Sequence, residues 1–173
     1  MPYRTSVRGL FDALASSRTV TDDVEIADVA LGGQSYHFEG PASFEIDLTN
    51  AGAGIVAGGV VRATVLTPCS RCLCDARLSV EAEVDAFYVL PGREEDLPEE
   101  QEAELIADDM TVDLEPSVAA ALVVELPFAP LHDEHCKGIC PVCGADRNTD
   151  ACDCVVTAED SRFAALRELK VDE

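Results

Sequence analysis

The apolar positions near the N-terminus follow a helical period. Their spacings of three and four residues are those of one helix face, and they fall at Val7, Leu10, Phe11 and Leu14. The pattern therefore predicts a short N-terminal helix over residues 5–17, packed on the body of the protein.

From Val24 onward the period changes to two, which indicates β-strands with one buried face. The alternation is clearest over residues 44–48 and 77–90. Residues 55–66 predict a further, apolar strand, and Gly58-Gly59 predicts a bulge or bend in it.

Two further helices are predicted. Residues 115–126 form an apolar stretch that begins near Pro116, a residue suited to a first helical turn, and ends before Pro127. A capping-box pattern at Thr157 precedes an apolar stripe and predicts a C-terminal helix over residues 157–173. The expected fold class is α+β: an antiparallel β-sheet or partly open barrel with flanking helices.

The chain is strongly acidic, with 173 residues and a formal net charge of -22 at pH 7. Such a surface repels nucleic acid over most of its area. We therefore expect no DNA binding, and any RNA contact should be local or made through a partner. The acidic run over residues 92–109 is interpreted either as a solvated loop or as a docking surface for a basic protein.

The N-terminus has no continuous apolar run with a small-residue cleavage site, which argues against a secretory signal. No apolar run approaches the roughly 20 residues of a membrane-spanning helix. We expect a cytoplasmic protein without membrane contact. In a reducing compartment, cysteines at short spacing indicate metal or redox chemistry before disulfides.

The eight cysteines form two clusters. Cys69, Cys72 and Cys74 lie between two predicted strands, and so at a hairpin tip over residues 67–75. The other five, with two of the three histidines, lie between residues 132 and 154. Zinc prefers four thiolate or imidazole ligands in a tetrahedral arrangement, and these spacings suit it.

The last four cysteines predict one closed zinc site within the tail. Cys140 and Cys143 are separated by two residues, and Gly144 can take the positive φ that closes such a turn. Cys152 and Cys154 supply the other two sulfurs.

The remaining ligands predict a second zinc site, which joins the tail to the hairpin tip. Three thiolates come from Cys69, Cys72 and Cys136. We favour His132 over His135 as the fourth ligand. His132 lies four residues from Cys136, so both can approach one ion, whereas His135 is adjacent to Cys136. Cys74 is left out and interpreted as a small packed thiol. Two Zn2+ ions per chain are thus predicted.

Disulfides, a redox-active pair at Cys69 and Cys72, and an iron–sulfur cluster are the alternatives for these cysteines. Because protein groups would fill all four positions of each zinc site, we expect structural rather than catalytic metal. The sequence also lacks a Ser/His/Asp set and a phosphate-binding glycine loop, so we expect no enzyme. The predicted organisation is a β-rich body over 1–131, a zinc-binding tail over 132–156 docked on the tip, and the C-terminal helix.

The motifs resemble those of a known family. Cys69-Ser-Arg-Cys72 is followed by an acidic gap, then Leu126-Pro127, then Cys136-Lys-Gly-Ile-Cys140-Pro-Val-Cys143-Gly144 and Cys152-Asp-Cys154. This order is similar to that of the YceD family, the large ribosomal RNA subunit accumulation proteins. The resemblance implies a role in 23S ribosomal RNA accumulation or processing, and so in large-subunit biogenesis. It also implies that Cys commonly stands at the position of His132.

Three functions are compatible with these observations. The first is a noncatalytic, zinc-stabilised factor that contacts ribosomal RNA or the pre-ribosomal large subunit through Arg71, Lys137 and Arg147, near the predicted ligands. The second is an acidic protein-interaction module that holds a basic ribosomal protein on residues 92–109. The third is a zinc-dependent RNA-processing enzyme, which would need a metal with a bound water.

Overall fold

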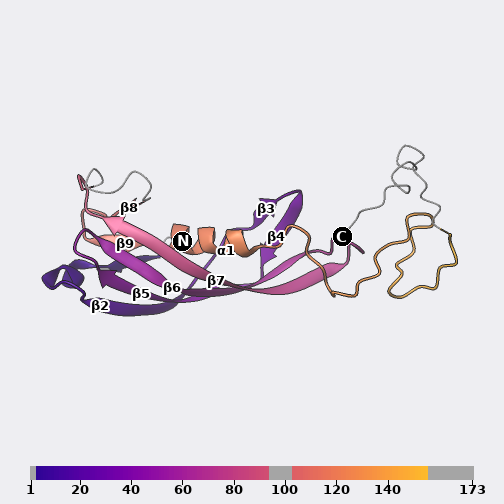
Figure 1. The fold of residues 1–173 in the computed structure, drawn as a ribbon, viewed down its shortest axis with the longest axis horizontal. Helices are drawn as coiled ribbons and strands as arrows, with labels where there is room; N and C mark the ends of the chain where they lie inside the picture. Colours follow the sequence, from indigo (N-terminus) through magenta and orange to yellow (C-terminus); the bar gives the residue numbers. More distant parts are fainter. Residues whose placement is uncertain (1–2, 94–102, 156–173) are drawn as a thin grey trace, which may run out of the picture.

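The computed structural model describes residues 3–93 and 103–155. Its main sheet consists of β2 (Ser17–Val24), β3 (Val29–Leu31), β4 (Gln34–Phe38), β5 (Ala42–Asn50), β6 (Ile55–Pro68), β7 (Asp75–Val89) and β8 (Glu104–Leu105). The remaining elements are β1 (Arg4–Ser6), the 3-10 helix η1 (Arg8–Asp12), β9 (Thr111–Asp113) and α1 (Glu115–Glu125). The molecule is elongated, with the cysteine-rich tail at one end (Figure 1).

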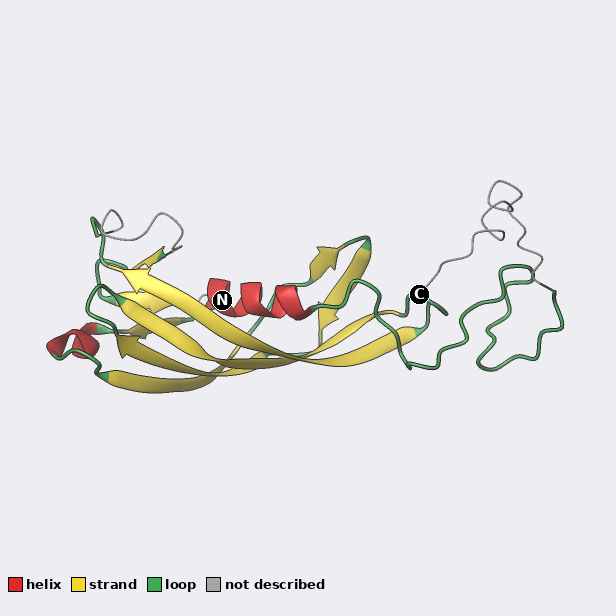
Figure 2. Cartoon of the chain, in the orientation of Figure 1, coloured by secondary structure: helices red, strands yellow, loops and turns green. Residues whose placement is uncertain are grey.

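The main sheet is open, and α1 lies against one of its faces (Figure 2). Its strands run in the order β2–β5–β6–β4–β3, and β7 pairs with β6 and with β8. The β7–β8 pair is parallel, whereas the other pairs among the described strands are antiparallel. The expected antiparallel sheet is therefore confirmed, in an open form.

β6 and β7 form a long hairpin that positions the first cysteine cluster. Their pairing runs from Ile55 opposite Tyr88 to Pro68 opposite Asp75. β5 accompanies β6 only as far as Arg62, so the outer part of the hairpin extends beyond it. The hairpin tip consequently lies toward the tail end of the molecule (Figure 1).

Alternating side chains build the core. On β5, Phe44, Ile46 and Leu48 are buried while Glu45 and Asp47 are exposed, as the period of two predicts. The same core contains Val80, Ala82 and Val84 from β7 and Val118 and Leu122 from α1. This apolar cluster holds the sheet and helix together and shares no residue with the small cluster around Cys69.

The N-terminal stretch differs from the helix expected over residues 5–17. Residues 4–6 form a strand, and Arg8–Asp12 form only a short 3-10 helix. The N–H of Val7 donates to the Met110 carbonyl (2.8 Å), which ties this stretch to the neighbourhood of β9 instead of to a helical turn. Val7 and Leu10 still face the core, whereas Leu14 is 73% exposed.

The glycine pair in β6 does not form the expected bulge. Pairing continues through Gly58 and Gly59 on both sides, without an extra residue. A Cβ at Gly59 would lie 2.1 Å from the Glu45 carbonyl oxygen, so glycine at this position allows close approach of β5.

α1 occupies the stretch in which a helix was expected, and it is the one α-helix in the described part of the chain. The helix expected over residues 157–173 lies outside the described residues, as do residues 94–102 of the acidic run. No helix within the described ranges is long and apolar enough to cross a membrane.

Candidate metal centre

The hairpin tip holds Cys69 and Cys72 in a tight turn. The N–H of Cys69 donates to the Cys74 carbonyl (2.8 Å), and the N–H of Leu73 donates to the Cys69 carbonyl (2.9 Å). Leu73 takes a positive φ of 64°, which bends the chain back on itself. Both Cys69 and Cys72 are buried, in a small apolar cluster separate from the main core.

The segment after α1 continues to this tip and is bonded to it. The N–H of Ser70 donates to the Pro130 carbonyl (2.8 Å), and the N–H of Ile139 donates to the Arg71 carbonyl (3.1 Å). The guanidinium of Arg71 donates to the Cys136 carbonyl (2.9 Å). Hydrogen bonds thus hold the tail against the tip from residue 130 to residue 139.

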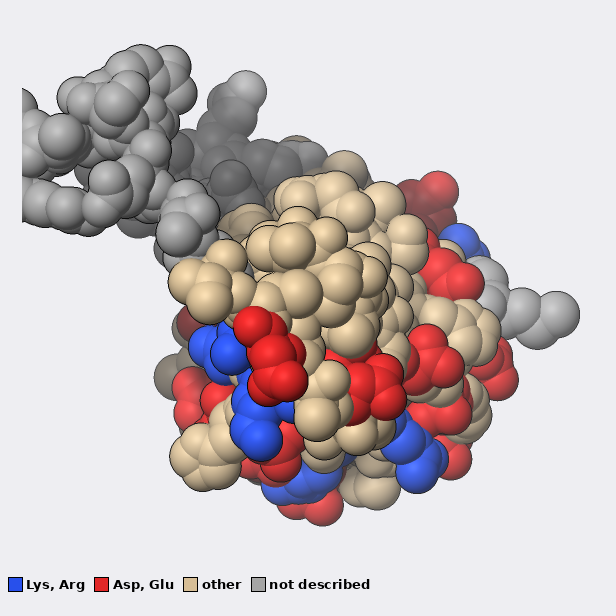
Figure 3. Space-filling view, turned by 90° about the vertical axis from the view of Figure 1, so that its right-hand side faces the viewer, with Lys and Arg blue, Asp and Glu red and all other residues tan. Residues whose placement is uncertain are grey.

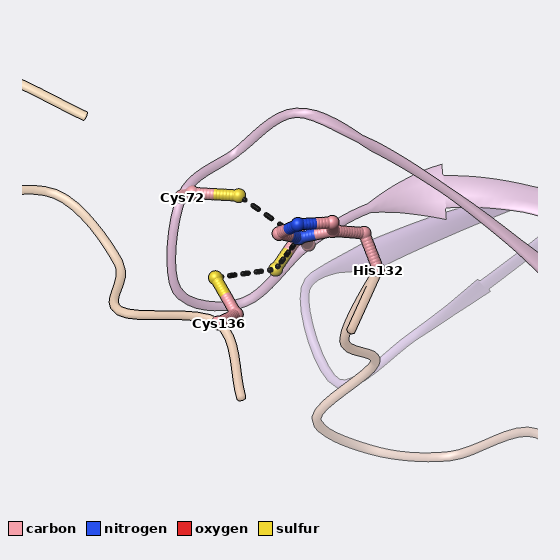
Figure 4. Close-up of side chains that lie close together, drawn as sticks. Cys72, His132 and Cys136 are labelled. Carbon is pink, nitrogen blue, oxygen red and sulfur yellow. Dashed lines mark hydrogen bonds between the residues drawn. The ribbon is translucent and has the colours of Figure 1, made fainter. Parts of the chain in front are cut away.

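Cys69, Cys72, His132 and Cys136 meet at this contact. Figure 4 shows how Cys72, His132 and Cys136 point toward one another. Their donor atoms all lie within 4.8 Å of one another. The Sγ atoms of Cys69 and Cys136 are 3.8 Å apart, and Nδ1 of His132 lies 3.5 Å from Cys69 Sγ and 3.3 Å from Cys72 Sγ. Tetrahedral zinc, with bonds of about 2.3 Å to sulfur and 2.0 Å to nitrogen, places sulfurs about 3.8 Å apart and sulfur–nitrogen pairs about 3.5 Å apart. The four side chains therefore fit one zinc ion.

The surroundings of the first cluster favour one thiolate. Burial tends to raise the pKa of Cys69, but hydrogen bonds from His132 and from backbone N–H groups, including that of Arg71, outweigh it and lower the pKa to about 5. Burial raises the pKa of Cys136. A second thiolate is thus opposed in the absence of a cation, which is the situation that a divalent metal relieves.

Two residues beside the cluster are not part of it. His135 is exposed, and the clustered donors include His132 but not His135. Cys74 is exposed, not packed as expected, and its Sγ lies 3.0 Å from that of Cys72. Their hydrogen bond raises the pKa of Cys72. All eight cysteines are free and lie within the described residues. Cys74 alone belongs to neither group of four donors that could hold a metal ion.

The second cluster is built within the tail from Cys140, Cys143, Cys152 and Cys154. Their Sγ atoms lie within 4.8 Å of one another, and those of Cys143 and Cys152 are 3.5 Å apart. Gly144 has the positive φ that was predicted, 75°, and its N–H donates to the Cys140 carbonyl (2.9 Å). A set of four sulfurs suits zinc and also iron.

Hydrogen bonds also favour one thiolate in the second cluster. Backbone N–H groups of Cys143 and Val142 lower the pKa of Cys140 to about 6. Hydrogen bonds with Cys152 and Cys143 raise the pKa of Cys154 to about 12. Each cluster thus combines one favoured thiolate with thiols whose pKa its surroundings raise, Cys136 in the first and Cys154 in the second, and a bound cation would favour their ionisation.

Asn148 supports the first cluster and was not predicted. Its Nδ2 donates to Cys136 Sγ (3.5 Å), and its Oδ1 accepts the N–H of Lys137 (2.8 Å). Asp146 Oδ1 accepts the N–H of Asn148 (2.9 Å) and shapes the polar turn between the two halves of the second cluster. The Asp-Arg-Asn-Thr-Asp stretch beginning at Asp146 is the sequence signal for this turn.

The three basic residues proposed for partner contact all lie near the clusters but are used differently. Lys137 and Arg147 are exposed. Arg71 is also exposed, yet its guanidinium is bonded to tail carbonyls. Viewed from the tail end, Lys and Arg side chains are interleaved with Asp and Glu and do not form one continuous cationic surface (Figure 3).

Known proteins resemble this chain over the hairpin and the tail. Residues 57–170 match the family described as large ribosomal RNA subunit accumulation protein YceD. An uncharacterized protein of Mycobacterium tuberculosis is 33% identical over 106 residues, which cover 60% of this chain and 51% of that protein. An uncharacterized protein of Mycobacterium leprae is 29% identical over 104 residues, which cover 60% of this chain and 48% of that protein.

The chain spans about half the length of the curated relatives that it matches. No solved structure matches it significantly. The family match extends over most of β6, all of β7, α1 and both cysteine clusters, which are the elements that build the candidate metal centre. The chain therefore belongs to the YceD family.

Proposed function

We propose that this protein is a noncatalytic, zinc-stabilised factor that supports 23S ribosomal RNA accumulation and large-subunit biogenesis. The description of its family supports the ribosome-related role. The observation that carries the metal proposal is the meeting of Cys69 and Cys136, which are 67 residues apart in the chain, with Cys72 and His132.

The geometry supports a structural role for the metal. Each cluster offers four protein donors, so a bound zinc ion would keep no position for water or substrate. Zinc at the first cluster would fasten the tail to the hairpin tip, and zinc at the second would fix the tail's own turns. Structural zinc contributes on the order of 10 kcal/mol to the folding of small zinc-binding peptides.

The protein purified under reducing conditions is expected to contain two zinc ions per chain, one for each cluster. About one thiol, that of Cys74, should react rapidly in the native protein, and all eight should react after chelation and denaturation. Elemental analysis with thiol titration measures both quantities. Metal-free protein that stays folded with freely reacting thiols would exclude the zinc sites. Bound iron with visible absorbance would indicate an iron–sulfur cluster in place of zinc.

We place the contact with ribosomal RNA or the pre-ribosomal large subunit on the exposed turns of the tail. Lys137 adjoins the first cluster, and the N–H of Arg147 donates to the Gly138 carbonyl (3.0 Å), which keeps both cations beside it. Arg71 has the different task of holding the tail carbonyls. Replacing Arg71 would disturb the hydrogen bonds between the tail and the hairpin tip. An Arg71 variant would therefore not test a contact with RNA by itself.

Replacing Lys137 and Arg147 together by Glu is expected to reduce co-sedimentation with pre-ribosomal large subunits at least about tenfold, because phosphate contacts change from attraction to repulsion. Zinc content should not change, since neither side chain is a candidate ligand. Replacing Arg4 and Arg8 by Glu is the matched control, with the same change of charge in β1 and η1, outside both clusters. Equal co-sedimentation of both double variants would remove the tail surface from the proposal.

A further inference from the structure

β7 is an exposed edge of the main sheet over most of its length. Its inner side pairs with β6 from Asp75 to Tyr88, whereas on its outer side β8 pairs only with Tyr88 and Val89. Within the described ranges, no other strand pairs with the outer side. An unpaired strand edge is a template for the addition of another strand.

The direction of the backbone groups along this edge follows from the contact with β8. The N–H of Ile106 donates to the Val89 carbonyl (2.8 Å), so that carbonyl points outward. Backbone groups alternate sides along a paired strand, and the β6–β7 register continues without a bulge. The backbone groups that point outward before Val89 therefore belong to Phe87, Asp85, Glu83, Glu81 and Ser79.

A groove of about 650 Å³ lies along this edge, between β7 and α1. Its lining includes the acidic residues Glu83, Asp85 and Glu104, and the lining of a neighbouring hollow adds Glu81 and Glu125. None of the described residues that line the two hollows is lysine, arginine or histidine.

The groove is also lined by small apolar side chains. Ala120, Ala121 and Val124 of α1 line it together with Ala86 of β7, and Val124 is 80% exposed. Alanine leaves room beside the strand, so side chains of an added strand could reach α1. The groove thus combines acidic residues, small apolar side chains and an open backbone edge.

We propose that this groove binds an extended segment of a partner protein, in which basic and apolar residues alternate, as an additional strand on β7. Side chains of a strand point alternately to its two faces. Lys or Arg on one face would meet Glu81, Glu83 and Asp85, and apolar residues on the other would meet Ala86 and α1. Backbone hydrogen bonds supply affinity in this mode of recognition, and the alternating side chains supply specificity.

This inference goes beyond the proposed function and requires neither metal cluster. It also assigns a basic protein partner to the groove instead of to the acidic run over residues 92–109. Of the residues that line the groove, Ala103 and Glu104 also belong to that acidic run.

The test is fluorescence anisotropy with the full chain and a labelled eight-residue peptide of alternating Lys and Val. Saturable binding is expected, and N-methylation of alternate peptide nitrogens should weaken it at least about tenfold by removing strand hydrogen bonds. Glu83→Pro removes one outward N–H while the β6 pairing keeps its own hydrogen bonds. Glu83→Gln is the matched control, because it removes the same charge and keeps the N–H.

We expect Glu83→Gln to weaken binding a few-fold and Glu83→Pro to weaken it at least about tenfold more. Circular dichroism establishes whether both variants are folded. If Glu83→Pro is unfolded, the methylated peptide tests the same hydrogen bonds on the unaltered protein. Equal affinity for the two peptides would overturn strand addition, as would equal affinity of two folded variants.

Charge and self-association supply the remaining outcomes. Replacing Glu83 and Asp85 by Lys should abolish peptide binding. Replacing Asp12 and Glu25 by Lys should leave most of the binding, because both are exposed and neither lines the groove. Equal losses would mean that the net charge of -22 attracts the peptide without a site, and would overturn the proposal. A dimer in sedimentation that Glu83→Pro dissociates would assign the edge to a second copy of the chain, and would overturn it as well.

Discussion

Cys136→Ser is expected to remove one of the two proposed zinc ions and to release the tail from the hairpin tip. Cys136 is only 4% exposed, and its Sγ lies 3.8 Å from that of Cys69. The hydroxyl of serine is a poor ligand for zinc compared with a thiolate, so three donors would remain. Because the cluster joins segments 67 residues apart, its loss should free the chain after Pro130.

The body should stay folded in this variant, since its apolar core shares no residue with the small cluster around Cys69 and Cys136. Elemental analysis should give about one zinc ion per chain, held by the second cluster. Limited proteolysis should cut between α1 and Cys140. In the unaltered protein the same segment is expected to resist cleavage, because its hydrogen bonds and the proposed ion hold it against the tip. A protein that keeps both ions would show that Cys136 is not a ligand.

Cys74→Ser is the matched control for that experiment. Cys74 is a cysteine at the same tip but is exposed and outside both clusters. Two zinc ions and a protected tail are expected. Loss of zinc from this variant would make Cys74 a ligand in place of His132, a result that the 3.0 Å separation of its Sγ from Cys72 Sγ would then explain.

The parts of the fold that local pattern could predict are the long strands with one buried face. β5 and β7 fall where apolar and polar residues alternate, because burial on one side of a strand imposes a period of two. β6 falls on a mostly apolar run between turn residues. The N-terminal strand was missed for a physical reason. Its pairing of Arg4 with Asp113 joins residues more than a hundred positions apart, and the nearby apolar spacing happens to match a helix.

The spacing of residues predicted the candidate site more completely than it predicted the fold. The same two sets of four donors that ligand spacing predicts are gathered in the structure, because zinc chemistry restricts both the number and the type of ligands. The supporting roles of Arg71 and Asn148 depend on the path of the tail across the tip, which no local pattern reports. Cys74 is likewise exposed in a tip turn where Leu73 takes a positive φ, and ligand spacing does not report that turn.

Gly59→Ala is expected to lower the free energy of unfolding by about 3 kcal/mol or more. A Cβ at this position would lie 2.1 Å from the Glu45 carbonyl oxygen and 2.7 Å from Ile46 Cα. Both atoms belong to the backbone of β5, and Gly59 is paired directly with Ile46, whose side chain is fully buried. No side-chain rotation can relieve this contact, so the two central strands would have to separate.

Gly58→Ala is the matched control, one residue away on the same strand. A Cβ there would meet nothing within 4 Å, so the change should be within about 1 kcal/mol of neutral, and alanine's smaller loss of backbone entropy could make it favourable. Urea unfolding of both variants, with equal m-values, measures the difference. Neither glycine is among those with positive φ, so conformational freedom does not explain a requirement at either position. A large loss at Gly59 alone would therefore measure the close approach of β5 to β6, whereas equal losses would mean that this approach does not determine the stability of the sheet.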